Sequence, residues 1–254
     1  MNRLLCTTAI ILSLSLYTVL ALASENQSAR DFLEANSTFQ KGNYEDALKQ
    51  YAQLIEKHPG NGHLYYNQGN AYLRLGHLGA AIAAYRQGLV FLPRNQDLKA
   101  NLTYARTLTK DDVKPVGAHP LIETLFFWHY FLNQHELVLV LVIINMLFWL
   151  SMACRLYFRG QSMFYWMNVT TFGLILAFGA SLLVHRVAPQ TIALVNEPEI
   201  EVYAANRVDS VVRFKLHAGS EVAVIGENQN WLRIRLDKTQ EGWLEKSKVA
   251  LVRL

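Results

Sequence analysis

The sequence predicts a multidomain membrane protein that combines an α-helical solenoid, a transmembrane α-hairpin and a small all-β barrel. Three observations predict this fold class: a residue pattern that returns after 34 positions, two long apolar blocks, and a C-terminal region of short alternating runs. Of the 254 residues, 52% are hydrophobic and 17% are charged, and the charged share lies below the ~25% of a typical soluble protein. This composition excludes a disordered chain, a collagen-like chain and a disulfide scaffold.

Residues 1–23 have the features of a secretory signal peptide. A basic Arg3 precedes an apolar stretch from Leu4 to Leu22, and the small residues Ala21 and Ala23 form an A-x-A cleavage site. The alternative is an uncleaved N-terminal anchor. In both cases the segment that follows is predicted to be exported.

Residues 24–110 contain a helical repeat in which the same residue types return at one fixed spacing. Small alanines, tyrosines four positions later, turn glycines and closing prolines recur in this way, which predicts two helical hairpins. A further helix, Gln96–Leu108, is predicted to cap the open end of the stack. The paired positions are Asn36 and Asn70, Gly42 and Gly76, Ala47 and Ala81, Tyr51 and Tyr85, and Pro59 and Pro93.

This pattern resembles the tetratricopeptide repeat, which has the same period, and four asparagines on the first helices of the units are its candidate binding residues. Asn36 and Asn70 are one period apart, as are Asn67 and Asn101. The resemblance implies a groove for extended peptides or protein tails. An amide side chain both donates and accepts hydrogen bonds, so it can hold a peptide backbone regardless of sequence. The alternative is that asparagine is simply common at these repeat positions.

The family's carboxylate clamp, which captures a chain terminus, is matched only in part. Asn36 and Asn67 match two of its positions. Phe32 and Asp97 stand at two of its basic positions, and Asn101 stands at a third. Capture of a chain terminus by this mechanism is therefore not predicted.

Residues 111–136 form a linker that ends in an aromatic segment. The stretch from Leu121 to Leu132 is rich in Phe, Trp and Tyr, which predicts an interfacial segment on the outer leaflet of a membrane. His135 and Glu136 begin like a zinc-protease motif, but Leu139 stands where the second histidine belongs. No metal site is predicted here.

Two transmembrane helices are predicted, at 137–154 and 163–185, because each block is long enough for a bilayer core of ~30 Å and neither shows a polar face. Two buried helices of a soluble protein are the alternative. The loop at 155–162 carries Arg155 and Arg159, so the positive-inside rule assigns it to the cytoplasm. Both terminal domains are then predicted to be periplasmic, on the outer side of a bacterial inner membrane.

The distribution of charge and cysteine excludes two further classes. Residues 24–115 hold 11 basic and 9 acidic side chains, and residues 188–254 hold 9 of each. Neither region is strongly basic, so nucleic-acid binding is disfavoured. After signal cleavage only Cys154 remains, so an intramolecular disulfide is excluded.

Residues 190–254 predict a small barrel of short strands. A glycine before one strand, a tryptophan that opens the next and a Gly-Trp pair resemble the bacterial SH3 domain; these marks are Gly219, Trp231 and Gly242-Trp243. Tyr203, Trp231 and Trp243 are the aromatic candidates for a binding surface, and their alternative role is core packing. The predicted strands are Thr191–Asn196, Glu199–Tyr203, Val211–Leu216, Glu221–Ile225, Trp231–Leu236, Gly242–Leu244 and Val249–Val252.

The order of signal peptide, tetratricopeptide repeats, two-span hairpin and bacterial SH3 domain resembles the BatE family of the Bacteroides aerotolerance cluster. The resemblance implies a non-enzymatic scaffold in an envelope complex, beside von Willebrand factor A-type membrane proteins and a MoxR-type ATPase. The alternative function is a peptidoglycan-binding membrane anchor that uses the SH3 domain. The residues provide no nucleophile motif, metal constellation or phosphate loop, so neither catalysis nor a cofactor is predicted.

Overall fold

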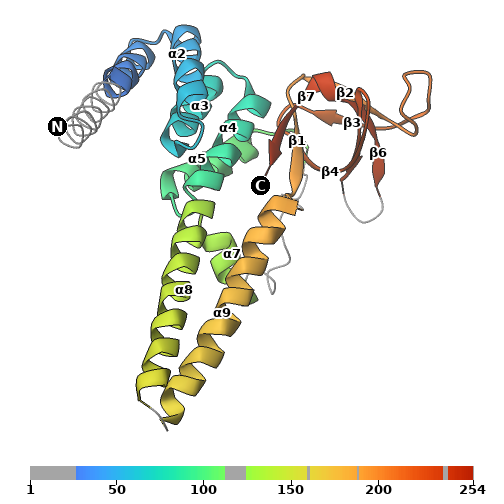
Figure 1. The fold of residues 1–254 in the computed structure, drawn as a ribbon. Coiled ribbons are helices and arrows are strands. Elements are labelled where there is room, and N and C mark those ends of the chain that lie inside the picture. Colours follow the sequence, from blue (N-terminus) through green and yellow to red (C-terminus); the bar gives the residue numbers. More distant parts are fainter. Residues whose placement is uncertain (1–26, 112–123, 159–160, 188, 237–239, 254) are drawn as a thin grey trace, which may run out of the picture.

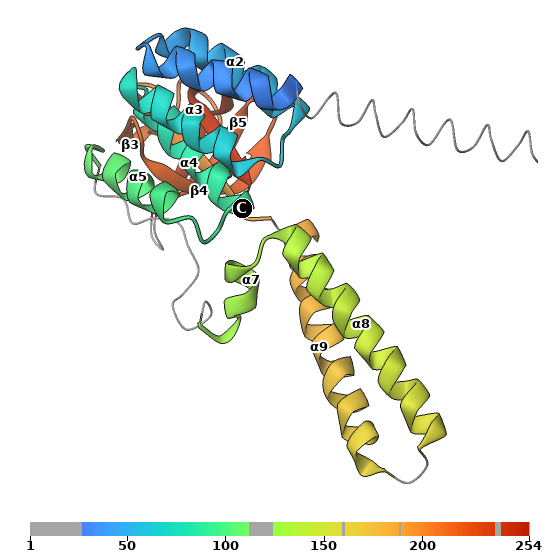
Figure 2. The same ribbon diagram turned by 90° about the vertical axis from the view of Figure 1, so that its left-hand side faces the viewer.

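The computed structural model describes residues 27–111, 124–158, 161–187, 189–236 and 240–253. The predicted signal peptide and most of the linker before the aromatic segment lie outside these residues. The helical region and the C-terminal sheet lie together as a head, from which a long helical hairpin projects (Figure 1). Figure 2 shows the same division from the side.

The helical region begins with a helix over residues 27–40, which forms the first hairpin with the helix that follows it; a second hairpin and a last helix come next. Gly42 and Gly76 adopt positive φ angles of 85° and 77° in the two turns where the repeat predicts glycine, because only a residue without a Cβ enters this region at no cost. The buried side chains include Tyr51 and Tyr85. The remaining helices are α2 (Tyr44–Lys57), α3 (Gly62–Arg74), α4 (Leu78–Phe91) and α5 (Gln96–Thr107).

Two long apolar helices, α8 (Gln134–Tyr157) and α9 (Ser162–Val187), form the hairpin. Both are long and apolar enough to span a membrane, and each extends beyond its predicted span at both ends. Asn133 begins α8 with a capping box, in which its side chain accepts from the Glu136 amide and the Glu136 side chain accepts from the Asn133 amide. A short helix, α7 (Phe127–Phe131), precedes α8 and lies beside α9 (Figures 1 and 2).

The C-terminal region is a seven-stranded antiparallel sheet in the order β3-β2-β6-β5-β4-β1-β7. Each predicted strand is present, with boundaries that differ by at most three residues. Alternating side chains such as Leu232 and Ile234 are fully buried in its core. The strands are β1 (Thr191–Val195), β2 (Glu199–Tyr203), β3 (Val212–His217), β4 (Glu221–Asn228), β5 (Trp231–Arg235), β6 (Glu241–Glu245) and β7 (Val249–Arg253), with a 3₁₀ helix at Lys246–Lys248 before β7.

The sheet and the helical region share a hydrophobic core along β1. Ala193 and Val195 face the interior of the sheet, whereas Ile192 and Leu194 pack among buried residues of α4 and α5. Because side chains alternate along a strand, β1 is buried on both faces. Gly79 of α4 permits this approach, since a Cβ at this position would lie 2.0 Å from the Val195 carbonyl oxygen.

A buried ionic cluster joins the same two regions. The Glu221 carboxylate of β4 accepts hydrogen bonds from Arg86 Nε at 2.8 Å and from Arg106 Nε at 2.6 Å. The Glu221 side chain is only 5% exposed. Burial would raise the pKa of Glu221, but the hydrogen bonds and charges of Arg106 and Arg86 outweigh it and hold that pKa below its ordinary value.

A second polar cluster lies at the end of the helical region. Asp111 accepts hydrogen bonds from the His217 amide at 2.7 Å and from the Ser220 hydroxyl. Its other carboxylate oxygen lies 2.7 Å from Nδ1 of His217. Burial opposes these contacts, yet the hydrogen bonds from Ser220 and His217 hold the pKa of Asp111 below its ordinary value.

The head is also fastened to the hairpin on both sides. The Arg94 guanidinium, which follows α4, forms a two-pronged ion pair with Glu136 in the first turn of α8. The Asn133 side chain donates to the Phe91 carbonyl at 3.2 Å. On the other side, only residues 188–190 separate the end of α9 from β1.

Candidate protein-binding surfaces

The four candidate asparagines form two hydrogen-bonded pairs that cross from one repeat unit to the next. Asn36 Oδ1 accepts from Asn67 Nδ2 at 2.9 Å and from the Tyr51 hydroxyl at 2.8 Å. The first pair therefore ties the helix at 27–40 to α3, while the tyrosine of α2 supports it from within the hairpin.

The second pair repeats this arrangement one unit later. Asn70 Oδ1 accepts from Asn101 Nδ2 at 2.8 Å and from the Tyr85 hydroxyl at 2.8 Å. Each member stands one repeat period after its counterpart in the first pair. We call the four residues, Asn36, Asn67, Asn70 and Asn101, the asparagine row, because both pairs have the same arrangement of hydrogen bonds.

The asparagine row retains hydrogen-bonding capacity after these internal bonds are made. A side-chain carbonyl oxygen has two acceptor sites. Asn36 and Asn70 therefore use their full acceptor capacity, whereas Asn67 and Asn101 bond through their nitrogens and keep a carbonyl oxygen that accepts from no other described residue. All four residues are partly exposed, so these oxygens are accessible to the N–H groups of a peptide backbone.

The two tyrosines position the row from inside the solenoid. Burial raises the pKa of Tyr51 to about 12 and raises that of Tyr85 as well, so both hydroxyls stay protonated and donate. The repeat pattern predicted their packing role but not these hydrogen bonds. The signal was present in the sequence, since each asparagine that accepts precedes its tyrosine by 15 positions in both units.

At the two ends of the asparagine row, exposed apolar side chains occupy the repeat positions that asparagine occupies elsewhere. Leu33 stands one repeat period before Asn67 and is 66% exposed, and Tyr104 stands one period after Asn70 and is 58% exposed. The surface therefore offers amides in the middle and apolar contacts at both ends. Neither residue is predictable as a binding residue from the sequence, because nothing local distinguishes these two positions from core positions.

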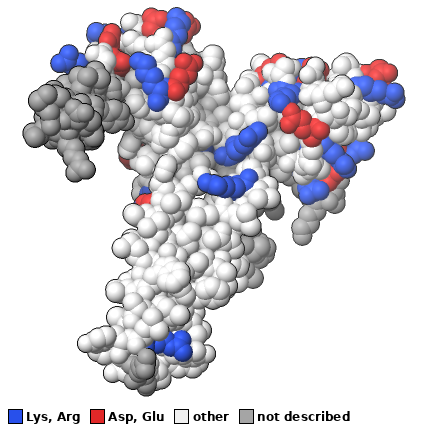
Figure 3. All heavy atoms as spheres, in the orientation of Figure 1, with Lys and Arg blue, Asp and Glu red and all other residues white. Residues whose placement is uncertain are grey.

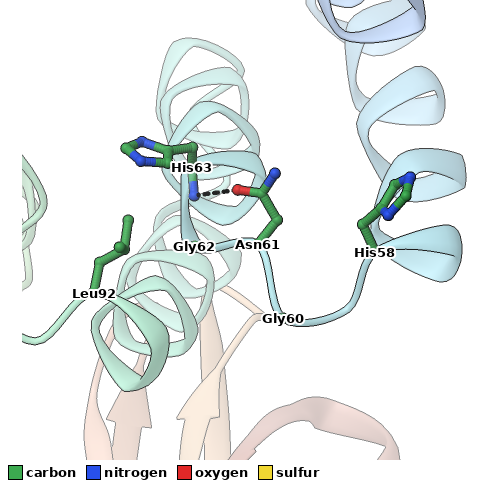
Figure 4. A pocket seen from close by; sticks show the side chains of 6 residues that line it. All are labelled: His58, Gly60, Asn61, Gly62, His63 and Leu92. Carbon is green, nitrogen blue, oxygen red and sulfur yellow. Dashed lines mark hydrogen bonds between the residues drawn. The ribbon is translucent and has the colours of Figure 1, made fainter. Parts of the chain in front are cut away.

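A separate open hollow lies at the turn between α2 and α3. His58, Asn61, Gly62, His63 and Leu92 contribute to its lining (Figure 4). Asn61 accepts from the His63 amide at 3.0 Å and so caps α3. Among the described residues no group of three or more His, Cys, Asp or Glu is placed to hold a metal ion.

The three aromatic candidates of the sheet lie on one face of β2, β6 and β5. The alternation that buries Val202, Leu232 and Leu244 turns Tyr203, Trp231 and Trp243 to the opposite face. Tyr203 and Trp231 meet edge to face with ring centroids 5.7 Å apart. Tyr203 and Trp243 are direct neighbours across the paired strands. We call these three residues the aromatic face.

Exposure differs among the members of the aromatic face. Tyr203 is only 5% exposed, and its hydroxyl donates to Glu201 at 2.9 Å. Trp231 and Trp243 are half-buried. Beside them Glu241 accepts from Arg233 at 2.9 Å and from Arg235 at 2.8 Å. Tyr203 therefore supports the surface, while the two tryptophans and the ion pairs form it.

Comparison with known proteins identifies one part of the chain. Residues 32–97 match the family model of the tetratricopeptide repeat. No curated protein matches the chain. The match covers the helix at 27–40 from residue 32, the helices α2 to α4 and the first residues of α5, and it includes three members of the asparagine row. The segment 32–97 is thus a tetratricopeptide repeat region, which implies protein partners.

Proposed function

We propose that this chain is a non-enzymatic inner-membrane scaffold of the BatE type, which holds partner proteins in an envelope complex of the aerotolerance cluster. The asparagine row carries this proposal, because the side chains of Asn67 and Asn101 are fixed by internal bonds and still offer carbonyl oxygens to a peptide backbone. The resemblance in domain order supports the assignment to this complex.

The polarity of the hairpin supports the membrane assignment. Its buried residues include the polar Ser151, Asn168 and Thr171, whereas the exposed side chains along both helices are predominantly apolar. A soluble helical pair has the reverse arrangement, and polar residues turned inward are typical of helices packed in lipid. Charged atoms gather on the head, and the hairpin is almost free of them in Figure 3.

The shared core supports a common side for both terminal regions. Ile192 and Leu194 of the sheet are buried against α4 and α5, so a membrane cannot separate the repeats from the sheet. Arg155 lies in the last turn of α8, at the opposite end of the hairpin. Under the positive-inside rule that end is cytoplasmic and the head is periplasmic.

The proposed partners are von Willebrand factor A-type membrane proteins and the MoxR-type ATPase system. We expect an extended segment of a partner to lie along the asparagine row, with apolar side chains against Leu33 and Tyr104. The sheet is proposed to be an SH3-like barrel whose aromatic face adds a second contact.

Crosslinking in native membranes, followed by mass spectrometry, tests the groove. In the double variant Asn67→Ala/Asn101→Ala the tyrosine bonds of Asn36 and Asn70 are kept, so only the two bonds between the asparagines are lost; circular dichroism checks that the solenoid is folded. We expect recovery of the von Willebrand factor A-type partner to fall about tenfold, which corresponds to roughly 1.4 kcal/mol of binding energy. Asn43→Ala, an exposed asparagine whose side chain makes no cap bond, is the control. Unchanged recovery with the double variant would exclude the asparagine row as the binding site for this partner.

A second candidate function, a peptidoglycan-binding anchor, is favoured by the half-buried tryptophans of the aromatic face. Sedimentation with purified sacculi distinguishes it from the scaffold. The full-length protein is required, because an isolated sheet would expose Ile192 and Leu194. The scaffold proposal predicts that the protein stays in the supernatant. Sedimentation that Trp231→Ala abolishes would favour the anchor instead.

A further inference from the structure

The short helix α7 is attached to the side of α9 by its polar residues. Nδ1 of His129 lies 2.6 Å from the Ser181 hydroxyl oxygen, and the rings of His129 and His185 stack with centroids 4.1 Å apart. The Trp128 ring stacks on Phe178 at 5.7 Å. The inner side of α7 thus carries its most polar side chains.

The outer side of α7 and of the two residues before it is aromatic and apolar. Five large side chains there are between 43% and 68% exposed within a stretch of seven residues. They are Leu125, Phe126, Phe127, Tyr130 and Phe131. Helix α7 lies beside α9 in both views (Figures 1 and 2), and α9 also exposes large apolar side chains.

The contacts of α7 fix its level along the hairpin. At about 1.5 Å per residue, Ser181 lies about 7.5 Å and Phe178 about 12 Å from Arg186 along α9. The interfacial layer on each side of a bilayer is roughly 5–7 Å thick. If the Arg186 charge lies at the headgroups, the Trp128–Phe178 stack lies at or below the boundary of the hydrocarbon core.

We infer that α7 is a third membrane-embedded element, inserted into the periplasmic leaflet with its aromatic side against lipid. The inference rests on the proposed membrane assignment of the hairpin. Three observations carry it: the polar contacts point inward, the apolar side chains point outward, and the level matches the outer leaflet. The same inverted polarity distinguishes α8 and α9, so one occupant, the lipid of the bilayer, covers all three helices.

Two contacts with Arg94, which follows α4, connect α7 to the repeats. The Arg94 guanidinium lies 4.9 Å from the centre of the Phe131 ring, and it donates to the Phe131 carbonyl at 3.2 Å. The Arg94 guanidinium therefore lies at the C-terminal end of α7, at the proposed level of the boundary between the lipid acyl chains and the headgroups. Arginine and aromatic residues are typical of this layer.

Spin labels at three sites of closely similar exposure test the inference. Phe127→Cys reports on α7, Leu150→Cys on the middle of α8, and Val208→Cys on the sheet; their native side chains are 61%, 61% and 63% exposed. Each is made in full-length protein whose two native cysteines are replaced by alanine. The protein is reconstituted in phosphatidylcholine–phosphatidylglycerol vesicles with a water-soluble nickel chelate on both sides. Collision rates with oxygen and with the chelate are then measured.

We expect the Phe127 label to collide with oxygen as the Leu150 label does, with chelate contact at least fivefold below that of the Val208 label. If the Phe127 label follows Val208 while Leu150 stays in lipid, α7 lies in water and the inference fails while the hairpin proposal stands. If the Phe127 label is shielded from both reagents, a protein covers α7 and lipid is excluded as its occupant. If the Leu150 label follows Val208, the membrane assignment itself is wrong.

Discussion

The Glu221 carboxylate of the sheet lies 2.6 Å from Nε of Arg106 in the last helix of the solenoid, and the two residues are 115 positions apart in the chain. Arg86 approaches the same carboxylate from α4. One buried anion therefore holds two cations, all three supplied across the junction between the repeats and the sheet. Its removal would leave two arginines in a poorly hydrated site.

Glu221→Gln is accordingly expected to destabilise the head strongly. Breaking a buried ion pair by removing one partner typically costs about 3–5 kcal/mol. The free energy of unfolding, followed by tryptophan fluorescence in denaturant, measures this loss. Glu227→Gln provides the matched control, because its pair with Lys246 is about half exposed and such pairs contribute little. Equal stability of the two variants would refute the structural role of the cluster.

Acid is expected to weaken the same junction. The pKa values of Asp111 and Glu221 both lie below their ordinary values of 3.8 and 4.5. The unfolded chain therefore binds these protons first as the pH falls, so the folded state loses stability below about pH 4.5 and keeps it above. Unfolding measured between pH 3 and pH 7 should show this slope.

Asp111→Asn should flatten part of that acid slope, whereas Asp209→Asn should leave it unchanged. The Asp209 side chain is 77% exposed, so it serves as the control. If the free energy of unfolding fell equally steeply with pH in the wild type and in Asp111→Asn, Asp111 would not contribute to the acid sensitivity.

The asparagine row predicts an asymmetry between its two kinds of member. Asn36→Ala leaves the hydroxyl of the buried Tyr51 without its acceptor, at a cost of about 1–3 kcal/mol. Asn67→Ala removes only the bond between the asparagines, which is worth about 0.5–1.5 kcal/mol. Chemical denaturation of both variants measures the difference. In the Tyr51→Phe background the cost of Asn36→Ala should shrink; an unchanged cost would mean that the tyrosine bond contributes nothing.

Gly79 offers a test of the close contact between α4 and β1. Gly79→Ala places a methyl group against the Val195 carbonyl, so helix and strand must separate, at about 1–3 kcal/mol for such overpacking. Glu45→Ala is the matched substitution one repeat earlier, at an exposed second position of α2. A drop in thermal stability confined to Gly79→Ala is expected, and a tolerated Gly79→Ala would show that the junction adapts freely.

Membrane topology is expected to follow the shared core. Alkaline phosphatase fused after Leu254 should be active, because that enzyme folds only outside the cytoplasm, whereas a fusion within the loop at 155–162 should be inactive. Activity of the loop fusion, or its absence at the C-terminus, would reverse the orientation.

Local pattern predicted most of the elements of this chain. The repeat spacing located Gly42 and Gly76, whose positive φ angles form the repeated turns. Alternation located the strands, since burial of Leu232 and Ile234 follows directly from it. The start of α8 is set by the capping box of Asn133 and Glu136 rather than by hydropathy, so these two polar residues fell outside the predicted span.

Relationships across the chain were not predictable in this way. The partners of Glu221 lie 115 and 135 positions away, and no periodicity connects them. The second buried face of β1 was also invisible, because Ile192 and Leu194 look the same in sequence whether they meet solvent, a partner or α4. At the candidate site, the repeat located the four asparagines, but their internal bonds depend on how the helices stack.

The two short attachments between head and hairpin have a consequence for recognition. Arg94 binds the start of α8, and only residues 188–190 connect α9 to β1. Under the proposed membrane assignment, we expect these attachments to restrict the rotation of the head relative to the hairpin. The asparagine row is then held at a fixed distance from the membrane surface and in a fixed orientation. A partner anchored in the same membrane would need a linker of suitable length between its own transmembrane span and its docking segment. A linker that is too short cannot reach the asparagine row, and a linker that is too long lowers the effective concentration of the docking segment at the row.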